Sequence, residues 1–134
     1  MKMKNALLIL IIVLFVNCAA PAPDTSNIRP LVKEFLVALS RHDMTAARVR
    51  ATDAFVTNIG GEDALTALMD CHAAFLVPNL FEFESPQPDG SSYHTRAYLH
   101  DGKCNMLPLD IWVVATDSGW KVDRLLWHQP VKER

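Results

Sequence analysis

The chain has 134 residues and a formal net charge of −2, from 13 basic and 15 acidic residues. This length is enough for one globular domain and too short for two. Beyond the scattered Arg41, Arg48 and Arg50, the domain carries no cluster of basic residues. Nucleic-acid binding, which depends on clustered Lys and Arg that neutralise phosphates, is therefore disfavoured.

The first segment has the pattern of a secretory signal peptide. Lys2 and Lys4 precede eleven consecutive apolar residues, 6–16. A membrane-spanning helix needs about 18 or more apolar residues, so this run is too short to be one, whereas a charged start and a short apolar core are typical of an export signal. We therefore predict that residues 1–17 are removed, which leaves 117 residues with a net charge of −4.

Two routes of processing fit the residues that follow. The segment LFVNC (residues 14–18) resembles the bacterial lipobox, apart from its second and fourth residues, and in a lipobox the cysteine is acylated. Ordinary signal peptidase would cut after Ala20, but the proline that follows usually blocks that enzyme. We expect an acyl anchor on Cys18, with soluble export as the alternative. Ala19 resembles the sorting residue of lipoproteins sent to the outer membrane, so we expect the periplasmic side of that membrane, or otherwise a periplasmic or secreted protein.

The chain then divides into a short connection and one domain. APAPDTSN (residues 20–27) is polar and proline-rich, which indicates a tether. The predicted organisation is a signal peptide (1–17), a lipidated cysteine with a flexible tether (18–27) and a single domain (28–134).

Apolar residues at helical spacing fill the first half of the domain. They predict a helix over residues 28–41, a second over 44–51 that Asp43 caps, and a third over 62–77. Phe55, Val56 and Ile59 are predicted to form a short hydrophobic link before the third helix.

The periodicity then changes to the two-residue alternation of strands. Strands are predicted at residues 80–84, 92–100, 103–115 and 120–128, joined as an antiparallel meander by turn-forming residues. Pro108 indicates an edge position or a bulge in the third strand. Trp120 follows the turn glycine and is predicted to be a core anchor. The expected fold class is α+β, with three N-terminal helices packed on a curved four-stranded antiparallel sheet.

Two cysteines remain in the predicted domain, Cys71 and Cys104. Outside the cytoplasm such a pair can be oxidised. A disulfide between them would close a loop of about 33 residues and stabilise the fold by roughly 3 to 4 kcal/mol. The alternative is a pair of buried free thiols.

The element order, the break SRHDMTAAR (residues 40–48) and the ending DSGWKVDRLLW (residues 117–127) resemble the nuclear transport factor 2-like superfamily, which includes ketosteroid isomerase and the polyketide cyclases. The resemblance covers residues 28–130. It implies a cone in which a curved sheet wraps a long helix and leaves a pocket. Some members use this pocket for catalysis and many for binding or assembly. The resemblance therefore allows a homodimer, and fold alone does not decide function.

Four residues are expected to line that pocket and bind a ligand: His72, Asp110, Arg124 and His128. Alternation puts one set of side chains on a single face of the last strand, namely Trp120, Val122, Arg124, Leu126 and His128. A His beside an Asp in a dry cone could perform acid–base chemistry. A His on an apolar face is more often a core residue, and an Arg at a sheet end is more often solvated, so no residue is assigned as catalytic. Trp120→Ala is accordingly expected to destabilise the protein more than Asp110→Asn.

Motifs for other chemistry are absent from the sequence. It has no Gly-rich phosphate loop, nucleophile elbow or Cys-x-x-Cys. His94 and His100 are six residues apart, and no HxH or HxxxH spacing occurs. No metal or cofactor is expected.

Three functions are consistent with these observations. We expect an exported, lipid-anchored binding or interaction module of the bacterial cell envelope, without catalysis, that takes a small apolar ligand or a protein. A dedicated partner would make it a subunit of an envelope machine or an immunity protein against a secreted toxin. The remaining alternative is a small pocket enzyme, an isomerase, dehydratase or hydrolase. An occluded cone would favour binding on the surface.

Overall fold

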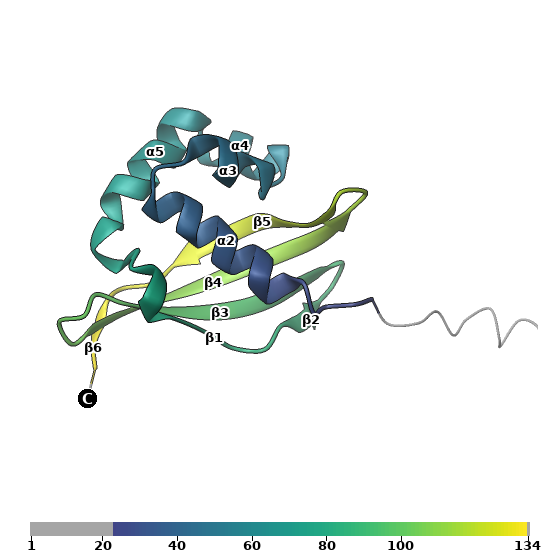
Figure 1. Cartoon of the computed structure of the whole chain (residues 1–134). Coiled ribbons are helices and arrows are strands. Elements are labelled where there is room, and N and C mark those ends of the chain that lie inside the picture. Colours follow the sequence, from purple (N-terminus) through teal and green to yellow (C-terminus); the bar gives the residue numbers. More distant parts are fainter. Residues whose placement is uncertain (1–22, 134) are drawn as a thin grey trace, which may run out of the picture.

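The computed structural model of the protein describes residues 23–133, so the predicted signal peptide and Cys18 lie outside the described residues. Within this part of the chain the fold is α+β, as predicted, with an antiparallel sheet that does not close (Figure 1). The helices are α2 (Ile28–Ser40), α3 (Met44–Val49), α4 (Asp53–Ile59) and α5 (Glu62–Cys71), followed by the short 3-10 helices η1 (Ala73–Phe75) and η2 (Pro78–Leu80). The strands are β1 (Phe81–Phe83), β2 (Gln87–Asp89), β3 (Ser92–His100), β4 (Asn105–Thr116), β5 (Gly119–Trp127) and β6 (Val131–Lys132).

Residues 23–133 form four α-helices rather than the three predicted. The additional helix, α4, covers the segment predicted as a hydrophobic link. Thr52 caps its start, because the side-chain oxygen accepts a hydrogen bond from the Phe55 amide at 3.0 Å, and Gly60 ends it with φ of 109°. α5 ends at Cys71, short of the predicted Val77, and 3-10 turns replace its last part.

β4 is the centre of the sheet. It pairs with β3 on one side and with β5 on the other, while β1 and β2 both pair with β3 and β6 pairs with β4 beyond the end of β5. Four strands were predicted, and the described residues form six, because each of the two outer strands is split in two. Residues 84–86 separate β1 from β2, and residues 128–130 separate β5 from β6.

Pro108 was predicted to lie at a sheet edge or at a bulge. It lies in this central strand instead, and the register shift of the β4–β5 pairing falls between Trp112 and Val113. Its carbonyl oxygen accepts a hydrogen bond from the His128 amide at 3.0 Å. The N and C=O of one residue point to the same side of an antiparallel strand, so the missing N–H faces the β5 and β6 side. There the β5 ladder starts at Leu109 and the β6 ladder ends at Met106. The proline sits between two ladders and interrupts neither.

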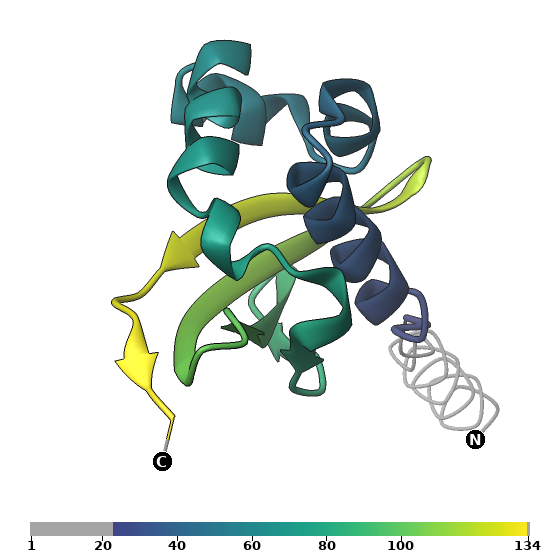
Figure 2. The same ribbon diagram turned by 60° about the vertical axis from the view of Figure 1, so that its left-hand side comes forward.

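The helices described here all lie on one face of the sheet, the upper face in Figure 1, and Figure 2 shows the same layering from the side. Between the layers, the side chains of Leu107, Leu109, Ile111 and Val113 from β4 are each at most 1% exposed. They belong to one hydrophobic core with the buried residues of α2, which are Ile28, Val32, Phe35, Leu36, Ala38 and Leu39. The interior of the fold is therefore filled by apolar side chains.

The opposite face carries no helix within residues 23–133, and we call it the open face. It is formed by His94, Arg96 and Tyr98 of β3, Pro108, Asp110 and Trp112 of β4, Arg124 and Leu126 of β5, and His128. These side chains alternate with the buried ones along β3 and β4, as a two-residue period requires.

A β-bulge changes which residues of β5 share a face. The register shifts between Trp112 and Val113, which pair with Arg124 and Val122, so Asp123 is the extra residue. Directly paired residues point to the same side, and Val113 is in the core whereas Trp112 is on the open face. Trp120 and Val122 therefore face the helices, while Arg124, Leu126 and His128 face away from them, and the single face predicted for all five is wrong.

Trp120, predicted to be a core anchor, is half-buried at the end of the sheet, where it packs against the core. Its ring meets that of Tyr93 edge to face, with centroids 5.4 Å apart. Its indole Nε1 donates a hydrogen bond to the carbonyl oxygen of Asp24 at 3.1 Å. Trp120 thus joins the start of the described chain to the β4–β5 hairpin.

Candidate functional site

A charged cluster is built around Asp110 in the middle of the open face. Although no helix of the described residues covers this face, Asp110 is only 5% exposed, because its neighbours cover it. Arg96 lies directly opposite on β3 and donates from Nε and Nη2 to the two carboxylate oxygens, both at 2.9 Å. His94 contacts the carboxylate through Nε2 at 2.7 Å, and His128, just after β5, contacts it through its own Nε2. One carboxylate therefore receives four hydrogen bonds.

These contacts keep Asp110 ionised. The hydrogen bonds from Arg96, with smaller contributions from His128 and His94, hold the pKa of Asp110 well below its usual value and outweigh the opposing effect of burial. The same bond raises the pKa of Arg96, so the guanidinium stays charged. A carboxylate this acidic is a poor proton acceptor. Asp110 is better suited to hold its neighbours in place than to act as a base.

The carboxylate fixes the orientation of both imidazole rings. When His94 and His128 are neutral, the Nε2 that meets Asp110 must carry the proton, which leaves Nδ1 as a hydrogen-bond acceptor. Their side chains are 30% and 36% exposed. The cluster thus presents two oriented rings and one guanidinium edge to solvent.

A second cluster adjoins the first through His94. The His94 ring lies 5.0 Å from that of Trp112, and the guanidinium carbon of Arg124 lies 3.6 Å from the centre of the Trp112 ring, a cation–π contact. The Trp112 indole donates to Asp89 at 2.8 Å. A shallow pocket of about 270 Å³ lies here, lined by Asp89, Ser92, Trp112, Asp123 and Arg124. Trp112 is therefore held on both its ring face and its N–H edge.

The four predicted site residues do not share one pocket. Asp110 and His128 are in direct contact, and Arg124 lies on the same face beside them. His72 is on the helix side, where its ring stacks on Trp127 with centroids 3.8 Å apart and burial lowers its pKa. The sheet therefore lies between His72 and the other three residues.

His94 and Arg96 complete the cluster, and neither was predicted from the sequence as a site residue. Their positions on alternate residues of the second predicted strand place them on one face, but this alternation does not indicate which residue of the next strand lies opposite. The pairing of Arg96 with Asp110 depends on the register of the β3–β4 turn.

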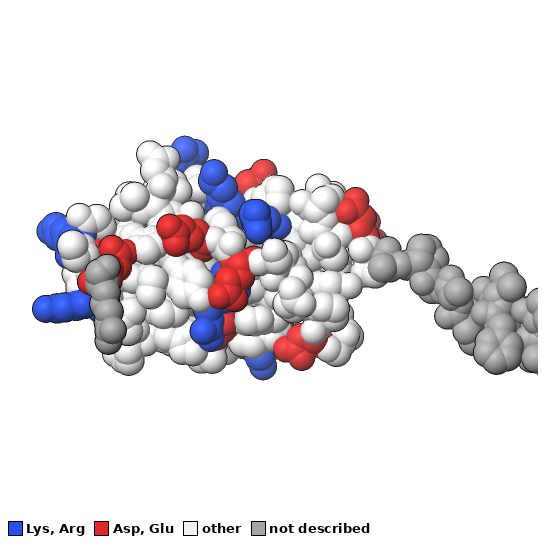
Figure 3. Space-filling view, turned by 90° about the horizontal axis from the view of Figure 1, so that it is seen from below, with Lys and Arg blue, Asp and Glu red and all other residues white. Residues whose placement is uncertain are grey.

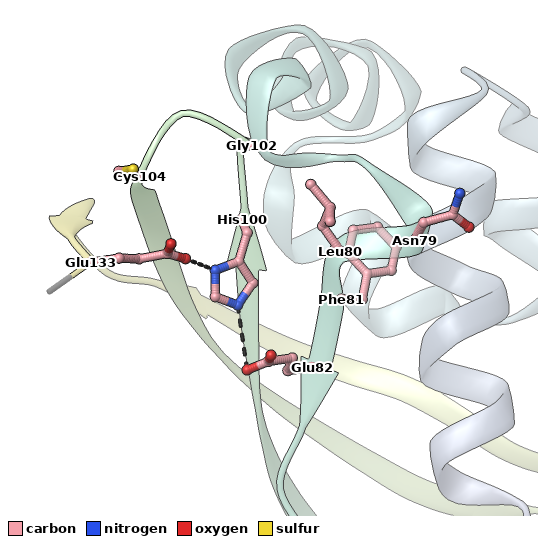
Figure 4. A pocket seen from close by; sticks show the side chains of 8 residues that line it. All are labelled: Asn79, Leu80, Phe81, Glu82, His100, Gly102, Cys104 and Glu133. Atoms are coloured by element: carbon pink, nitrogen blue, oxygen red, sulfur yellow. Dashed lines mark hydrogen bonds and ion pairs between the residues drawn. The ribbon is translucent and has the colours of Figure 1, made fainter.

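A larger pocket, about 400 Å³, lies at the opposite end of the sheet and is shown in Figure 4. His100 is placed between two carboxylates, with Nδ1 on Glu133 and Nε2 3.4 Å from Glu82. Phe81 and Cys104 contribute to the lining. The charged groups of this pocket are partnered with one another, which joins the β6 end of the chain to β1 and β3.

Charges of both signs are interspersed on the open side of the molecule. Figure 3 looks onto it from below, and the blue and red side chains alternate over a mostly uncharged surface. Arg96 is paired with Asp110, and Tyr98 donates to Glu84 at 2.5 Å, which raises the pKa of Tyr98. This mixture is unlike the uniformly basic surface that binds polyanions.

The disulfide expected between Cys71 and Cys104 is not formed. Both are free thiols, and both are exposed, so the alternative of buried thiols does not hold either. α5 ends at Cys71 on its solvent side, while Cys104 occupies the β3–β4 turn with φ of 66°. The two elements present their thiols to solvent rather than to each other.

No family model matches the chain, and no curated protein matches it. None of the helices in residues 23–133 is long and apolar enough to cross a membrane. Within the same range, no three His, Cys, Asp or Glu side chains are grouped as a metal site.

Proposed function

We propose that this protein is an exported, lipid-anchored binding module of the cell envelope, without catalysis, and that it docks a protein partner on the open face. The observation that carries the proposal is the contrast between the two sides of the sheet. The helix side is filled by aliphatic residues such as Leu109 and Ile111, which leaves a small apolar ligand little room. The open side carries exposed and half-buried residues of the kind that bind proteins.

The composition of the open face supports a protein partner. Trp, Tyr and Arg are enriched at protein interfaces and dominate their binding energy. Trp112, Tyr98 and Arg124 are all on this face, beside Leu126, which is 50% exposed. The interspersed charges suit a protein surface of mixed sign better than a uniformly charged polymer.

The Asp110 cluster supports binding rather than acid–base chemistry. Side chains that are already fixed lose less conformational entropy when a partner binds. Asp110 fixes Arg96, His94 and His128 in this way, and its own charge is already neutralised. The resemblance to the nuclear transport factor 2-like superfamily remains a proposal, supported by the packing of α2 across an antiparallel sheet.

Site-specific photocrosslinking in intact cells tests the docking face. A photoreactive amino acid at Leu126 should give one discrete adduct, and Trp112→Ala should weaken it, because the indole is part of the same surface. Val49 on α3 is the matched control, since it is 62% exposed and apolar but lies away from the open face. Equal adducts from both positions, or none from Leu126, would reject the open face as the docking site.

Metabolic labelling tests the proposed anchor separately. A palmitate analogue should mark the protein, and Cys18→Ala should remove the label. The matched control is Cys71→Ser, which should keep the label because Cys71 lies in the folded domain. An unlabelled wild-type protein in the soluble fraction would establish ordinary export instead.

A further inference from the structure

The start of the described chain is fixed to one end of the sheet. Trp120 donates from Nε1 to the carbonyl oxygen of Asp24 at 3.1 Å. The chain then turns: the Ser26 amide donates to the Asp24 carboxylate at 2.9 Å and the Ile28 amide to the Thr25 carbonyl at 3.1 Å. Ile28 is fully buried in the core. From residue 24 onward the backbone is therefore part of the domain rather than of the tether.

This attachment shortens the connection to the proposed anchor. Six residue-to-residue steps separate Cys18 from Asp24. An extended chain advances at most about 3.3 to 3.6 Å per residue, so the connection spans no more than about 22 Å. The predicted tether of residues 18–27 is correspondingly reduced by the residues from Asp24 onward.

The sheet has two distinct ends, and the chain enters at one of them. Figures 1 and 2 both show the start of the described chain, just before α2, on the side of the β4–β5 hairpin. The β3–β4 turn, β6 and the C-terminus lie at the other end, together with the pocket around His100. A short connection can hold only the first of these ends close to a membrane.

We propose that the contact between Trp120 and Asp24 orients the domain on the lipid surface. The β4–β5 hairpin end is held near the bilayer, and the β3–β4 turn with the His100 pocket points away from it. The open face then runs from the membrane outward, where a partner can reach it from the side. This proposal rests on the acylation of Cys18 in the proposed function and adds the orientation of the docking face to it.

Energy transfer from the domain to labelled lipids tests the orientation. The full acylated protein, in vesicles that carry an acceptor dye on lipid headgroups, is labelled with a donor at one of two cysteines. One is the native Cys104 in a Cys71→Ser background, and the other is Ser118→Cys with Cys71 and Cys104 both changed to Ser. Ser118 is exposed in the β4–β5 turn and Cys104 is exposed in the β3–β4 turn. We expect transfer from position 118 to be severalfold stronger than from position 104.

An insertion identifies the cause of that difference. A Gly/Ser segment of about 16 residues between Ala20 and Pro21 adds a root-mean-square reach of about 20 to 24 Å and should abolish the contrast. Equal transfer from the two positions without the insertion would overturn the proposal. A contrast that survives the insertion would also overturn it, because an attraction of the domain surface to lipid would then set the orientation.

The failure of the anchor and the failure of the orientation are distinguishable. If the palmitate label is absent and the protein does not associate with vesicles, both proposals fall. If the label is present but the two positions report the same transfer, only the orientation falls. Trp120→Phe, which keeps a ring but removes the Nε1 donor, should reduce the contrast without removing the palmitate label.

Discussion

Asp110→Asn is expected to lower the free energy of unfolding by about 3 kcal/mol, since a buried carboxylate that receives charged hydrogen bonds loses its charge while its donors remain. The asparagine amide would also direct N–H groups at Arg96, His94 or His128. Denaturant melts at neutral pH measure the difference. From the sequence, Asp110→Asn was expected to destabilise the protein less than Trp120→Ala, because Asp110 was predicted to line a pocket. In the structure Asp110 is covered by its neighbours, so a large effect is expected.

Asp117→Asn makes the same chemical change at an exposed turn and serves as the control. It should shift stability by less than about 0.5 kcal/mol. If the two substitutions have equal effects, the Asp110 contacts contribute nothing specific to the fold.

The pH dependence of the unfolding free energy of wild type and of Asp110→Asn gives an independent check. The folded-state pKa of Asp110 lies below its unfolded value of about 3.9, so its contribution to stability is present above about pH 4 and is lost as pH falls toward the folded-state pKa. Wild type should therefore lose stability more steeply than Asp110→Asn between about pH 5 and pH 2. The difference in unfolding free energy between the two proteins should become smaller as the pH falls. A difference that stays constant would show that the ionisation of Asp110 is not its cause.

Phe35→Ala is expected to destabilise the protein by about 3 to 5 kcal/mol, because it leaves a cavity in the middle of the core. Phe35 is fully buried on α2 and meets Phe55 of α4 edge to face, with centroids 6.1 Å apart. A loss of this size approaches the whole stability of a small domain, about 5 to 15 kcal/mol, so the variant should unfold at much lower denaturant concentration.

Two comparisons sharpen that measurement. Val49→Ala, at a residue 62% exposed, should change stability by less than about 0.5 kcal/mol. Trp120→Ala should fall between the two, because Trp120 is only half-buried at the end of the sheet. If Trp120→Ala proved more damaging than Phe35→Ala, the centre of the core would lie at the hairpin instead of under α2.

Local patterns in the sequence were sufficient to predict the α+β class and the positions of the inner strands. Alternation from Leu107 to Val113 defines a half-buried strand, and helical spacing from Ile28 to Leu39 defines α2. α4 was missed because its cap, Thr52, precedes a run too short for its periodicity to be recognised.

The site was harder to predict from the sequence, because it depends on how β3, β4 and β5 are aligned with one another. A turn centred on Lys103 would pair Arg96 with Asp110, and that signal was present but unused. The bulge at Asp123 leaves no comparable local mark, yet it moves Arg124 and His128 to the opposite face from Val122. Long-range pairing, rather than residue type, determines which side chains meet.

The way the edges of the sheet are built affects the solubility of the protein at high local concentration. A long, unpaired edge strand recruits copies of itself into aggregates. On one side the edge consists of two three-residue strands, with Pro86 in the gap between them, and proline offers no N–H to an incoming strand. On the other side, the outward N–H and C=O of Val122 are already bonded to Arg50 and Thr52, at 2.8 and 2.9 Å. Copies of the protein crowded together on a two-dimensional surface would thus meet one edge that is short and interrupted by proline, and a second edge that is blocked at Val122.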